Sequence, residues 1–444
     1  MTRSLPPSHA PQGTVCHAVV QVYFQAWLEQ RRRTGRPVPG YVEEEFREFL
    51  GCGDPKSGVM TVACPTGHYS RCVADRCKGR GFCAYCLTLR QRELGSRLME
   101  GVLRNVPVLH GVLCFPPSIR CTLGYDRKLI DGGFAALTQA MFRYQRRRAA
   151  ELFGVPRDRI YPGCVAVNHR VSANLRPNHH FHGIFPDGVF IEVGSRLEFR
   201  RLPAPSEEDI TSIAYEAGLA FCEALKARGF WEARSTSGET IEGILKLPGT
   251  RPTPVKFFGQ SARNGEGGTA PRDGAYAFHL FVSKAIEVED RAQLQHLVNY
   301  VLAPPFRDDQ LMLNNAGEVV LQLKRERHDG TAQVVIRPYE FLDCLADLVP
   351  RPNSNSIRYY GIYASRARLR KLALGVRLDE SRPVERCRAE WMVCPVCDAE
   401  LQVVRPSRRS SESLPPDTPS PVIPGRKGSG VEGATDAEQG RLFG

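Results

Sequence analysis

Cysteine is concentrated in one short stretch of this chain, and that concentration limits the possible folds more than any other feature. Fifteen cysteines occur in 444 residues, and six of them lie between residues 52 and 86. The segment 1–13 is rich in Pro and Ser and has no apolar core of the kind that a signal peptide needs. We therefore expect a cytoplasmic protein with reduced thiols, in which clustered cysteines bind metal instead of forming disulfides.

Four of the clustered cysteines form the predicted structural zinc site. A CxxC turn places two thiolates on one tetrahedral ion, and two further thiolates close the site, which makes it structural and not catalytic. The predicted ligands are Cys64, Cys77, Cys83 and Cys86. His68 and Cys72 are spare candidates, and Cys52 is a weaker one. The basic residues around this knuckle that suit DNA contact are Lys78, Arg80 and Arg90.

A second CxxC pair lies near the C-terminus, at Cys394 and Cys397, with only Cys387 nearby. One such pair lacks enough ligands for a closed metal site. Whether it binds metal stays open at this point.

The pattern of apolar residues predicts an α+β protein: an N-terminal helical and zinc-knuckle domain, an antiparallel sheet flanked by helices, and a disordered tail. Gly, Pro, Thr and Arg are frequent in residues 233–273, which predicts a flexible insertion. The predicted divisions are a disordered segment 1–13, a helical zinc- and DNA-binding domain 14–100, a catalytic domain 104–350, a basic segment with CxxC at 351–405, and a disordered tail 406–444.

The formal net charge of +12 favours a polyanionic partner such as DNA. No stretch approaches the roughly 18 consecutive apolar residues that a transmembrane helix needs, so we expect no membrane partner. The sequence does not predict an oligomeric state.

Two histidines on one predicted strand are the sharpest site signal. His180 and His182 are two residues apart, so on a strand they project from the same face, while Phe181 and Phe185 point into the core. Imidazoles suit Mn²⁺, and a partly open site with oxygen ligands also accepts Mg²⁺. A His-hydrophobic-His triplet is weak evidence by itself, because surface or core histidines produce it by chance.

A tyrosine supplies the context for this pair. Tyr300 lies on a predicted helix, residues 290–302, at the flank of its apolar stripe, so it can reach a neighbouring sheet. A tyrosine beside a metal-polarised phosphate can act as a nucleophile. The alternative is a boundary tyrosine that only packs against the sheet.

Several collinear motifs resemble the bacterial rolling-circle transposases of the IS-ninety-one family, in the HUH nuclease superfamily. The resemblance spans residues 15–365, about four fifths of the chain. The matching stretches are Glu44–Leu50 with Cys52, Cys77–Cys86, Val106–Val108, Asn178–His182, Asp187–Phe190, Tyr300–Pro305, Leu323–Arg325, Asp329–Thr331, Pro338–Phe341, Leu345–Pro350, and Arg358-Tyr359 with Gly361.

The resemblance implies an N-terminal zinc-binding domain and an HUH-type sheet, with His180 and His182 as metal ligands and Tyr300 as the nucleophile. Some relatives carry a second tyrosine four residues on, where this chain has Pro304, so it resembles the single-tyrosine branch. The resemblance leaves the third metal ligand open. His279 is the first choice, His296 the second, and an acidic residue such as Asp187 remains an alternative.

The zinc region departs from the family because Cys64-Pro65-Thr66-Gly67 lacks the usual second cysteine of its pair. His68 or Cys72 could compensate. Lys324, in one of the matching motifs, is a further expected DNA contact.

The expected function is a transposase that nicks and rejoins single-stranded DNA through a 5′-phosphotyrosine, acting at the bacterial nucleoid. The expected cofactors are catalytic Mg²⁺ or Mn²⁺ and structural Zn²⁺. One alternative is a catalytically inactive or domesticated DNA-binding relative. Another is a replication initiator or relaxase-like HUH enzyme.

Overall fold

The structure is a computed structural model that describes residues 11–237, 240–262, 275–326, 330–375, 394–399 and 401–405. The predicted disordered tail 406–444 and Cys387 lie outside these residues. Within them, no helix combines the length and the apolar character needed to cross a membrane. The α+β class predicted from the sequence is confirmed.

Three helices begin the chain: α1 (Val15–Arg33), α2 (Gly40–Leu50) and α3 (Ala84–Gly101). The Thr14 side chain caps α1 by accepting a hydrogen bond from the His17 backbone amide. Phe24 and Trp27 of α1 are fully buried and pack against Phe46 of α2. The apolar sides of α1 and α2 therefore face each other.

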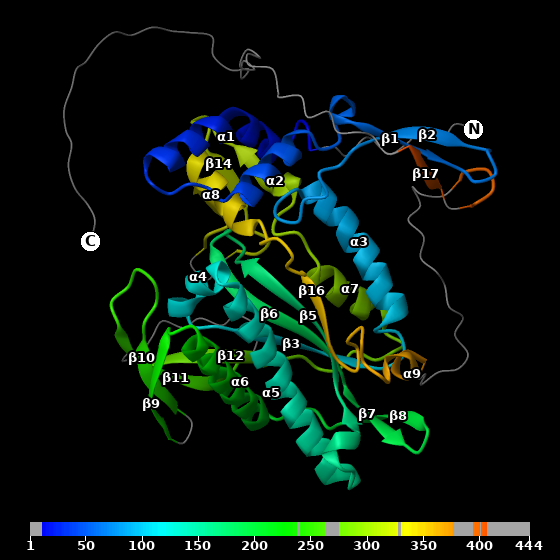
Figure 1. Ribbon diagram of the computed structural model, residues 1–444, viewed down its shortest axis with the longest axis vertical. Coiled ribbons are helices and arrows are strands. Elements are labelled where there is room, and N and C mark those ends of the chain that lie inside the picture. Colours follow the sequence, from blue (N-terminus) through cyan, green and yellow to red (C-terminus); the bar gives the residue numbers. More distant parts are fainter. Residues whose placement is uncertain are drawn as a thin grey trace. The chain divides into compact units, whose positions relative to one another are not determined.

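An eight-stranded sheet forms the centre of the molecule, in the order β16-β5-β6-β3-β12-β11-β10-β9 (Figure 1). Its strands are β3 (Val108–Cys114), β5 (Gly163–Val171), β6 (Pro177–Pro186), β9 (Trp231–Ser237), β10 (Thr240–Leu245), β11 (Thr253–Ser261), β12 (Ala275–Val282) and β16 (Ile357–Gly361). All neighbouring strands are antiparallel except β11 and β12, which are parallel.

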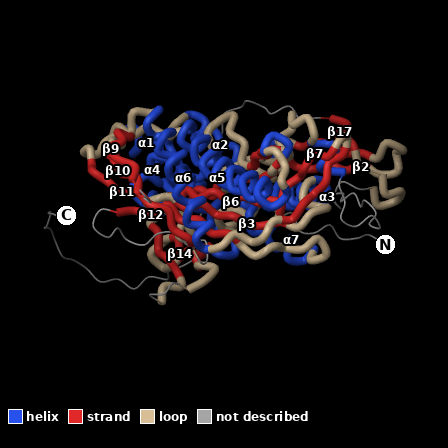
Figure 2. The backbone as a smooth tube through the Cα atoms, turned by 90° about the horizontal axis from the view of Figure 1, so that it is seen from below, coloured by secondary structure: helices blue, strands red, loops and turns tan. Residues whose placement is uncertain are grey.

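Helices cover both faces of this sheet. One face packs against α4 (Pro117–Tyr125), α5 (Arg127–Phe153) and α6 (Glu207–Ala227), and the other against α3, α7 (Arg291–Val301) and α9 (Arg370–Gly375). Figure 2 shows α5 and α6 on one side of β3 and β6, with α7 on the other. Gly133 permits the approach of α5, because a Cβ there would lie 2.5 Å from the Phe181 ring.

The prediction of a flexible insertion at 233–273 is wrong for the part of this range that the structure describes, because most of those residues form sheet. Strands β9, β10 and β11 extend the central sheet, while residues 238–239 and 263–274 lie outside the described part. Ile241 and Leu245 of β10 are buried against α6 and the neighbouring strands. Burial of alternate side chains thus outweighs the Gly- and Pro-rich composition.

A second core joins the N-terminal helices to a segment far along the chain. It contains α1, α2, the small sheet β13 (Leu311–Leu313), β14 (Val319–Gln322) and β15 (Gln333–Ile336), and α8 (Pro338–Leu348). The Trp27 indole N–H donates to Asp343 Oδ1 at 2.9 Å. Packing therefore crosses the boundary predicted between residues 100 and 104, and β16 carries the central sheet past the boundary predicted at residue 350.

Two further small sheets complete the described fold. One contains β17 (Gln402–Arg405), β1 (Val59–Ala63) and β2 (Ser70–Ala74), in that order, and the other contains β4 (Ile160–Tyr161), β7 (Gly188–Val193) and β8 (Arg196–Arg201). Short 3₁₀ turns lie at Pro55–Ser57, Arg157–Arg159 and Asp308–Gln310. Strand β17 thus places the last described segment of the chain beside β1.

Candidate metal and nucleophile centre

Strand β6 carries the histidine pair in the middle of the central sheet. Phe181 and Phe185 are fully buried in the core beneath α5. Because successive side chains alternate between faces, His180 and His182 lie on the opposite face, which α3 and α7 cover. The alternation predicted from the sequence is confirmed.

A third histidine, His169 of β5, joins this pair. The register places His169 directly opposite His180, next to an irregularity in the pairing of β5 with β6. One nitrogen from each of His169, His180 and His182 lies within 4.8 Å of the other two, which is close enough to hold one metal ion.

Hydrogen bonds leave one nitrogen of each ring available to an ion. His169 Nε2 donates to the Val301 carbonyl at 2.8 Å, and His180 Nδ1 donates to the Asn178 carbonyl at 2.7 Å. His182 Nδ1 is bonded to His110 Nε2 at 2.9 Å. The remaining His182 Nε2 is buried and has no hydrogen-bond partner in the described part of the chain. Metal-binding imidazoles are held in this way by partners on their second nitrogen, so the three rings fit a metal ion.

Burial keeps these imidazoles neutral, as metal binding requires. It lowers the pKa of His180 to about 3 and that of His110 to about 4, and the neighbouring His169 ring lowers both further because two charged imidazoles would repel each other. The pKa of His182 also lies well below its ordinary value, chiefly through burial. Burial lowers the pKa of His169, the bond to the Val301 carbonyl opposes that shift, and the Lys324 ammonium acts in the same direction as burial.

Tyr300 lies over the histidine cluster. Its ring centroid is 5.6 Å from that of His182, 6.0 Å from that of His169 and 6.1 Å from that of His110. The side chain is 51% exposed, so the ring contacts the cluster while remaining open to solvent. The sequence argument placed Tyr300 on the flank of its helix, and its ring does reach the neighbouring sheet.

Helix α7 is fixed at both ends. The Asp290 side chain caps its start by accepting from the Gln293 backbone amide. Arg291 forms an ion pair with Glu100 of α3 at 2.6 Å, and Gln91 of α3 donates to the Asn299 carbonyl. Helix α3 therefore runs beside α7 and holds it against the sheet (Figure 1).

The structure does not bring the expected third ligand to the cluster. His279 shares the register row of His180, but Cys114 of β3 stands between them. Since neighbouring strands are about 4.8 Å apart, His279 lies about 10 Å from His180 on the same face of the sheet. His296 is exposed on α7 and outside the cluster, and Asp187 is instead paired with Arg201 at 2.7 Å. His169 takes the third position.

The zinc-ligand set changes in a similar way. Cys77, Cys83 and Cys86 lie together as predicted, but the fourth thiol is Cys52 and not Cys64. Cys52 Sγ is 3.8 Å from Cys83 Sγ and 3.6 Å from Cys86 Sγ. Four thiolates at about 2.3 Å from one tetrahedral ion lie about 3.8 Å apart, so these four side chains fit zinc.

Glycine and a half-buried carboxylate shape the loop that carries these thiols. Glu45 Oε1 of α2 accepts hydrogen bonds from the backbone amides of Arg80 at 2.9 Å and Gly81 at 2.6 Å. A Cβ at Gly81 would lie 2.9 Å from that same oxygen, and the Gly79 amide donates to Cys77 Sγ. Burial raises the pKa of Glu45, although the two amide bonds oppose that shift.

The expected DNA contacts differ in their surroundings. Lys78, at the tip of the knuckle with φ 53°, and Lys324, near the histidines, are both exposed. Arg90 is half-buried on α3. Arg80 donates from Nη1 to the Ser354 carbonyl, so its guanidinium supports the fold.

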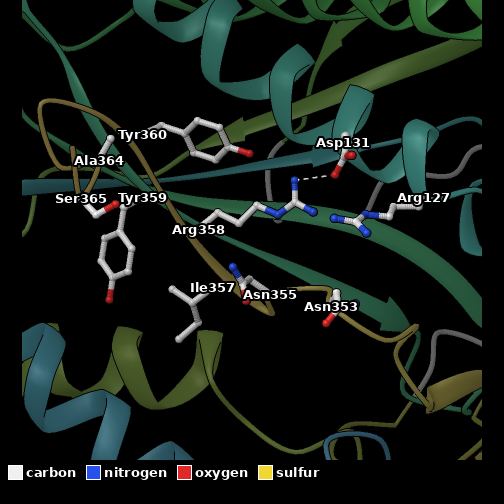
Figure 3. Close-up of a pocket in the computed structure, with 10 residues that line it drawn as sticks. All are labelled: Arg127, Asp131, Asn353, Asn355, Ile357, Arg358, Tyr359, Tyr360, Ala364 and Ser365. Carbon is white, nitrogen blue, oxygen red and sulfur yellow. Dashed lines mark ion pairs between the residues drawn. The ribbon is translucent and has the colours of Figure 1, made fainter. Parts of the chain in front are cut away.

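A separate hollow of about 450 Å³ lies along the edge strand β16 (Figure 3). Arg358 points across it to Asp131, and the two side chains form an ion pair at 2.7 Å. Arg358 also stacks on the Phe134 ring, with its guanidinium 4.3 Å from the centroid. Because a carboxylate neutralises Arg358, this hollow is not a simple basic groove for DNA.

Comparison with known families agrees with this arrangement. Residues 163–371 match the family model described as "Putative transposase" (Y2_Tnp), and residues 19–115 match the one described as "Transposase zinc-binding domain". The protein is therefore a transposase. Both matches are consistent with an IS-ninety-one-like transposase, and the resemblance inferred from the sequence is confirmed. No curated protein and no solved structure matches the chain.

Sequence reasoning missed His169 and His110 and ranked Cys52 too low. His110 is a polar residue within an otherwise apolar strand, which is a usable signal. His169 lies near the end of β5, just before the turn to β6, and pairing these two strands across that turn brings it next to His180.

Proposed function

We propose that this transposase nicks and rejoins single-stranded DNA through a 5′-phosphotyrosine at Tyr300. The observation that carries the proposal is the position of the Tyr300 ring, 5.6 Å from His182 and partly exposed beside three neutral imidazoles. A nucleophile next to a metal-binding cluster, on a face open to solvent, suits attack on a phosphodiester.

His169, His180 and His182 would hold Mg²⁺ or Mn²⁺. Such an ion polarises the scissile phosphate and stabilises charge on the leaving 3′ oxygen. His110, through its bond to His182 Nδ1, directs His182 Nε2 toward the ion. Three protein ligands leave positions open for phosphate and water oxygens.

Tyr300 Oη forms a bond to phosphorus as the bond between phosphorus and the 3′ oxygen breaks. The phenol loses its proton, and the leaving strand gains one to end in a 3′-hydroxyl. The phosphotyrosine retains the energy of the broken bond. Attack by another 3′-hydroxyl then reverses the step and releases Tyr300, so rejoining needs no nucleotide cofactor.

Charged side chains near the cluster supply the contacts to the strand. Lys324 is exposed and close enough to lower the pKa of His169, which suits contact with a phosphate next to the scissile one. Lys78 at the zinc knuckle and Arg90 on α3 would contact DNA farther away. An enzyme with this substrate works at the bacterial nucleoid.

The single tyrosine has a consequence for the reaction. Helix α7 ends at Val301, so Pro304, at the position of the second tyrosine, lies beyond the helix. Two cleavages therefore require either two turnovers of Tyr300 or a second copy of the chain.

The test uses labelled single-stranded oligonucleotides that cover the DNA flanking this gene, with Mn²⁺ or Mg²⁺. We expect a shortened strand with a 3′-hydroxyl and a covalent protein–DNA adduct at Tyr300, located by mass spectrometry. Tyr300→Phe removes the nucleophilic oxygen and should abolish the adduct. Tyr339→Phe, on α8 against Tyr23, is the matched control and should retain it.

Absence of the adduct with either ion, while the protein still binds the oligonucleotides, would overturn the proposal and favour the inactive DNA-binding alternative. An adduct that survives in Tyr300→Phe would also contradict it.

A further inference from the structure

A second group of metal-binding side chains lies outside both sites described above. Its members are Cys64, His68, Cys394 and Cys397, whose ligand atoms all lie within 4.8 Å of one another. More than 300 residues of sequence separate its two halves. Among the described residues, neither the histidine cluster nor the first zinc site uses any of these four side chains.

The backbone brings the two halves together. Cys64 follows the end of β1, and β17 pairs with β1 in antiparallel register, with Ala63 opposite Gln402. Cys64 and Cys394 are buried with Val62 and Leu401 in a small core of their own. The C-terminal segment is thus held here by strand pairing and apolar contact, and the ligand positions do not depend on an ion.

The side-chain geometry suits a tetrahedral ion. Cys64 Sγ lies 3.4 Å from Cys397 Sγ, close to the spacing of about 3.8 Å for two thiolates on one zinc. The same distance is far longer than a disulfide bond of about 2.05 Å. Thr66 Oγ1 bonds to His68 Nδ1 at 3.1 Å and fixes the orientation of that ring.

Backbone amides point at the sulfur atoms, as they do in the first zinc site. The Thr66 amide bonds to Cys64 Sγ, and the Val396 and Cys397 amides bond to Cys394 Sγ. In the first site, the Gly79 amide bonds to Cys77 Sγ in the same way. Such bonds stabilise thiolate, which is the form that binds metal.

We propose that Cys64, His68, Cys394 and Cys397 bind a second structural Zn²⁺, which joins the C-terminal segment to the β1–β2 hairpin. Three thiolates and one imidazole make a closed Cys₃His site. Three thiol protons leave as the ion binds, and His68 binds in its neutral form. His68 replaces the cysteine missing from Cys64-Pro65-Thr66-Gly67, and the C-terminal CxxC supplies the other two ligands.

The first test measures zinc per chain in the purified full-length protein. The double substitution Cys394→Ser with Cys397→Ser should lower the zinc content by one equivalent. Cys72→Ser is the matched control, because Cys72 is an exposed cysteine of the same hairpin outside the cluster, and it should leave the content unchanged. An unchanged zinc content in the double variant would overturn the proposal.

The second test needs no substitution, so it stands even if the double variant fails to fold. Cys72, Cys121 and Cys397 are all exposed. Alkylation followed by mass spectrometry should modify Cys72 and Cys121 quickly and Cys397 only after a chelator removes zinc. Equal modification of Cys397 and Cys72 in the zinc-loaded protein would contradict the site.

Cobalt substitution adds a check on His68, because His68→Cys should shift the visible bands toward those of four-thiolate coordination.

Discussion

Glu45 is the side chain through which α2 should stabilise the first zinc loop. Its Oε1 atom accepts both the Arg80 and the Gly81 amide, so Glu45→Ala removes two hydrogen bonds to a charged acceptor. Bonds to charged groups contribute about 1.5–3 kcal/mol each, so we expect a loss of about 3 kcal/mol in loop stability. Opening of the loop should then become roughly 100-fold more frequent.

The Glu45→Gln substitution tests the contribution of the carboxylate charge separately from that of the hydrogen-bond geometry. A glutamine keeps an oxygen at the Oε1 position and can accept from both amides, so only the charge assistance is lost. Neutral bonds are about half as strong as charge-assisted ones, so we expect a cost of about 1.5 kcal/mol, or roughly tenfold in opening.

The assay is hydrogen–deuterium exchange of the peptide that contains residues 78–82 in the zinc-loaded protein. Glu44→Ala is the control, because Glu44 is the adjacent, exposed residue of the same helix. The exchange rate should increase in the order Glu44→Ala, Glu45→Gln, Glu45→Ala. If Glu45→Ala and Glu44→Ala exchange at the same rate, the carboxylate does not hold the loop and the reasoning is refuted.

Three further predictions concern the catalytic face and the core. His169→Ala should abolish Mn²⁺ binding at the histidine cluster while His279→Ala preserves it, as isothermal titration can measure; the reverse result would restore His279 as the third ligand. His110→Phe removes the bond to His182 Nδ1 and should weaken Mn²⁺ binding about 10–100-fold, whereas the exposed His296→Phe should not. Gly133→Ala places a methyl 2.5 Å from the Phe181 ring and should cost about 2 kcal/mol in urea unfolding, while Gly101→Ala, with open space around it, should not destabilise the protein.

The parts of the site that depend on local pattern could be predicted from the sequence. The alternation of His180 and His182 with buried phenylalanines gave their common face. The apolar stripe of residues 290–302 gave the helix of Tyr300, and its observed bounds, Arg291–Val301, agree. Both patterns repeat over a few residues, so neither needs knowledge of a distant partner.

The parts of the site that depend on pairing between distant segments could not be predicted from the sequence. Choosing His169 over His279 requires the strand order β5-β6-β3-β12, because both residues share one face and one row. Choosing Cys52 over Cys64 requires knowing that α2 and its following turn pack on the knuckle, while β1 carries Cys64 elsewhere. The strands in 231–261 were missed for two reasons. Strand β9 presents polar residues at the edge of the sheet, and β11 presents polar residues beside a Gly-rich stretch.

The pairing of β1 with β17 also determines when this part of the chain can finish folding during synthesis. Thr61 pairs with Arg405, so the edge of β1 that pairs with β17 stays unpaired until the ribosome has made about 340 further residues. At about 5–20 residues per second, that wait lasts roughly 20–70 s on the ribosome. During this time an unpaired strand edge is available for wrong partners. The hairpin near the start of the chain is therefore among the last parts of this transposase to reach its final form.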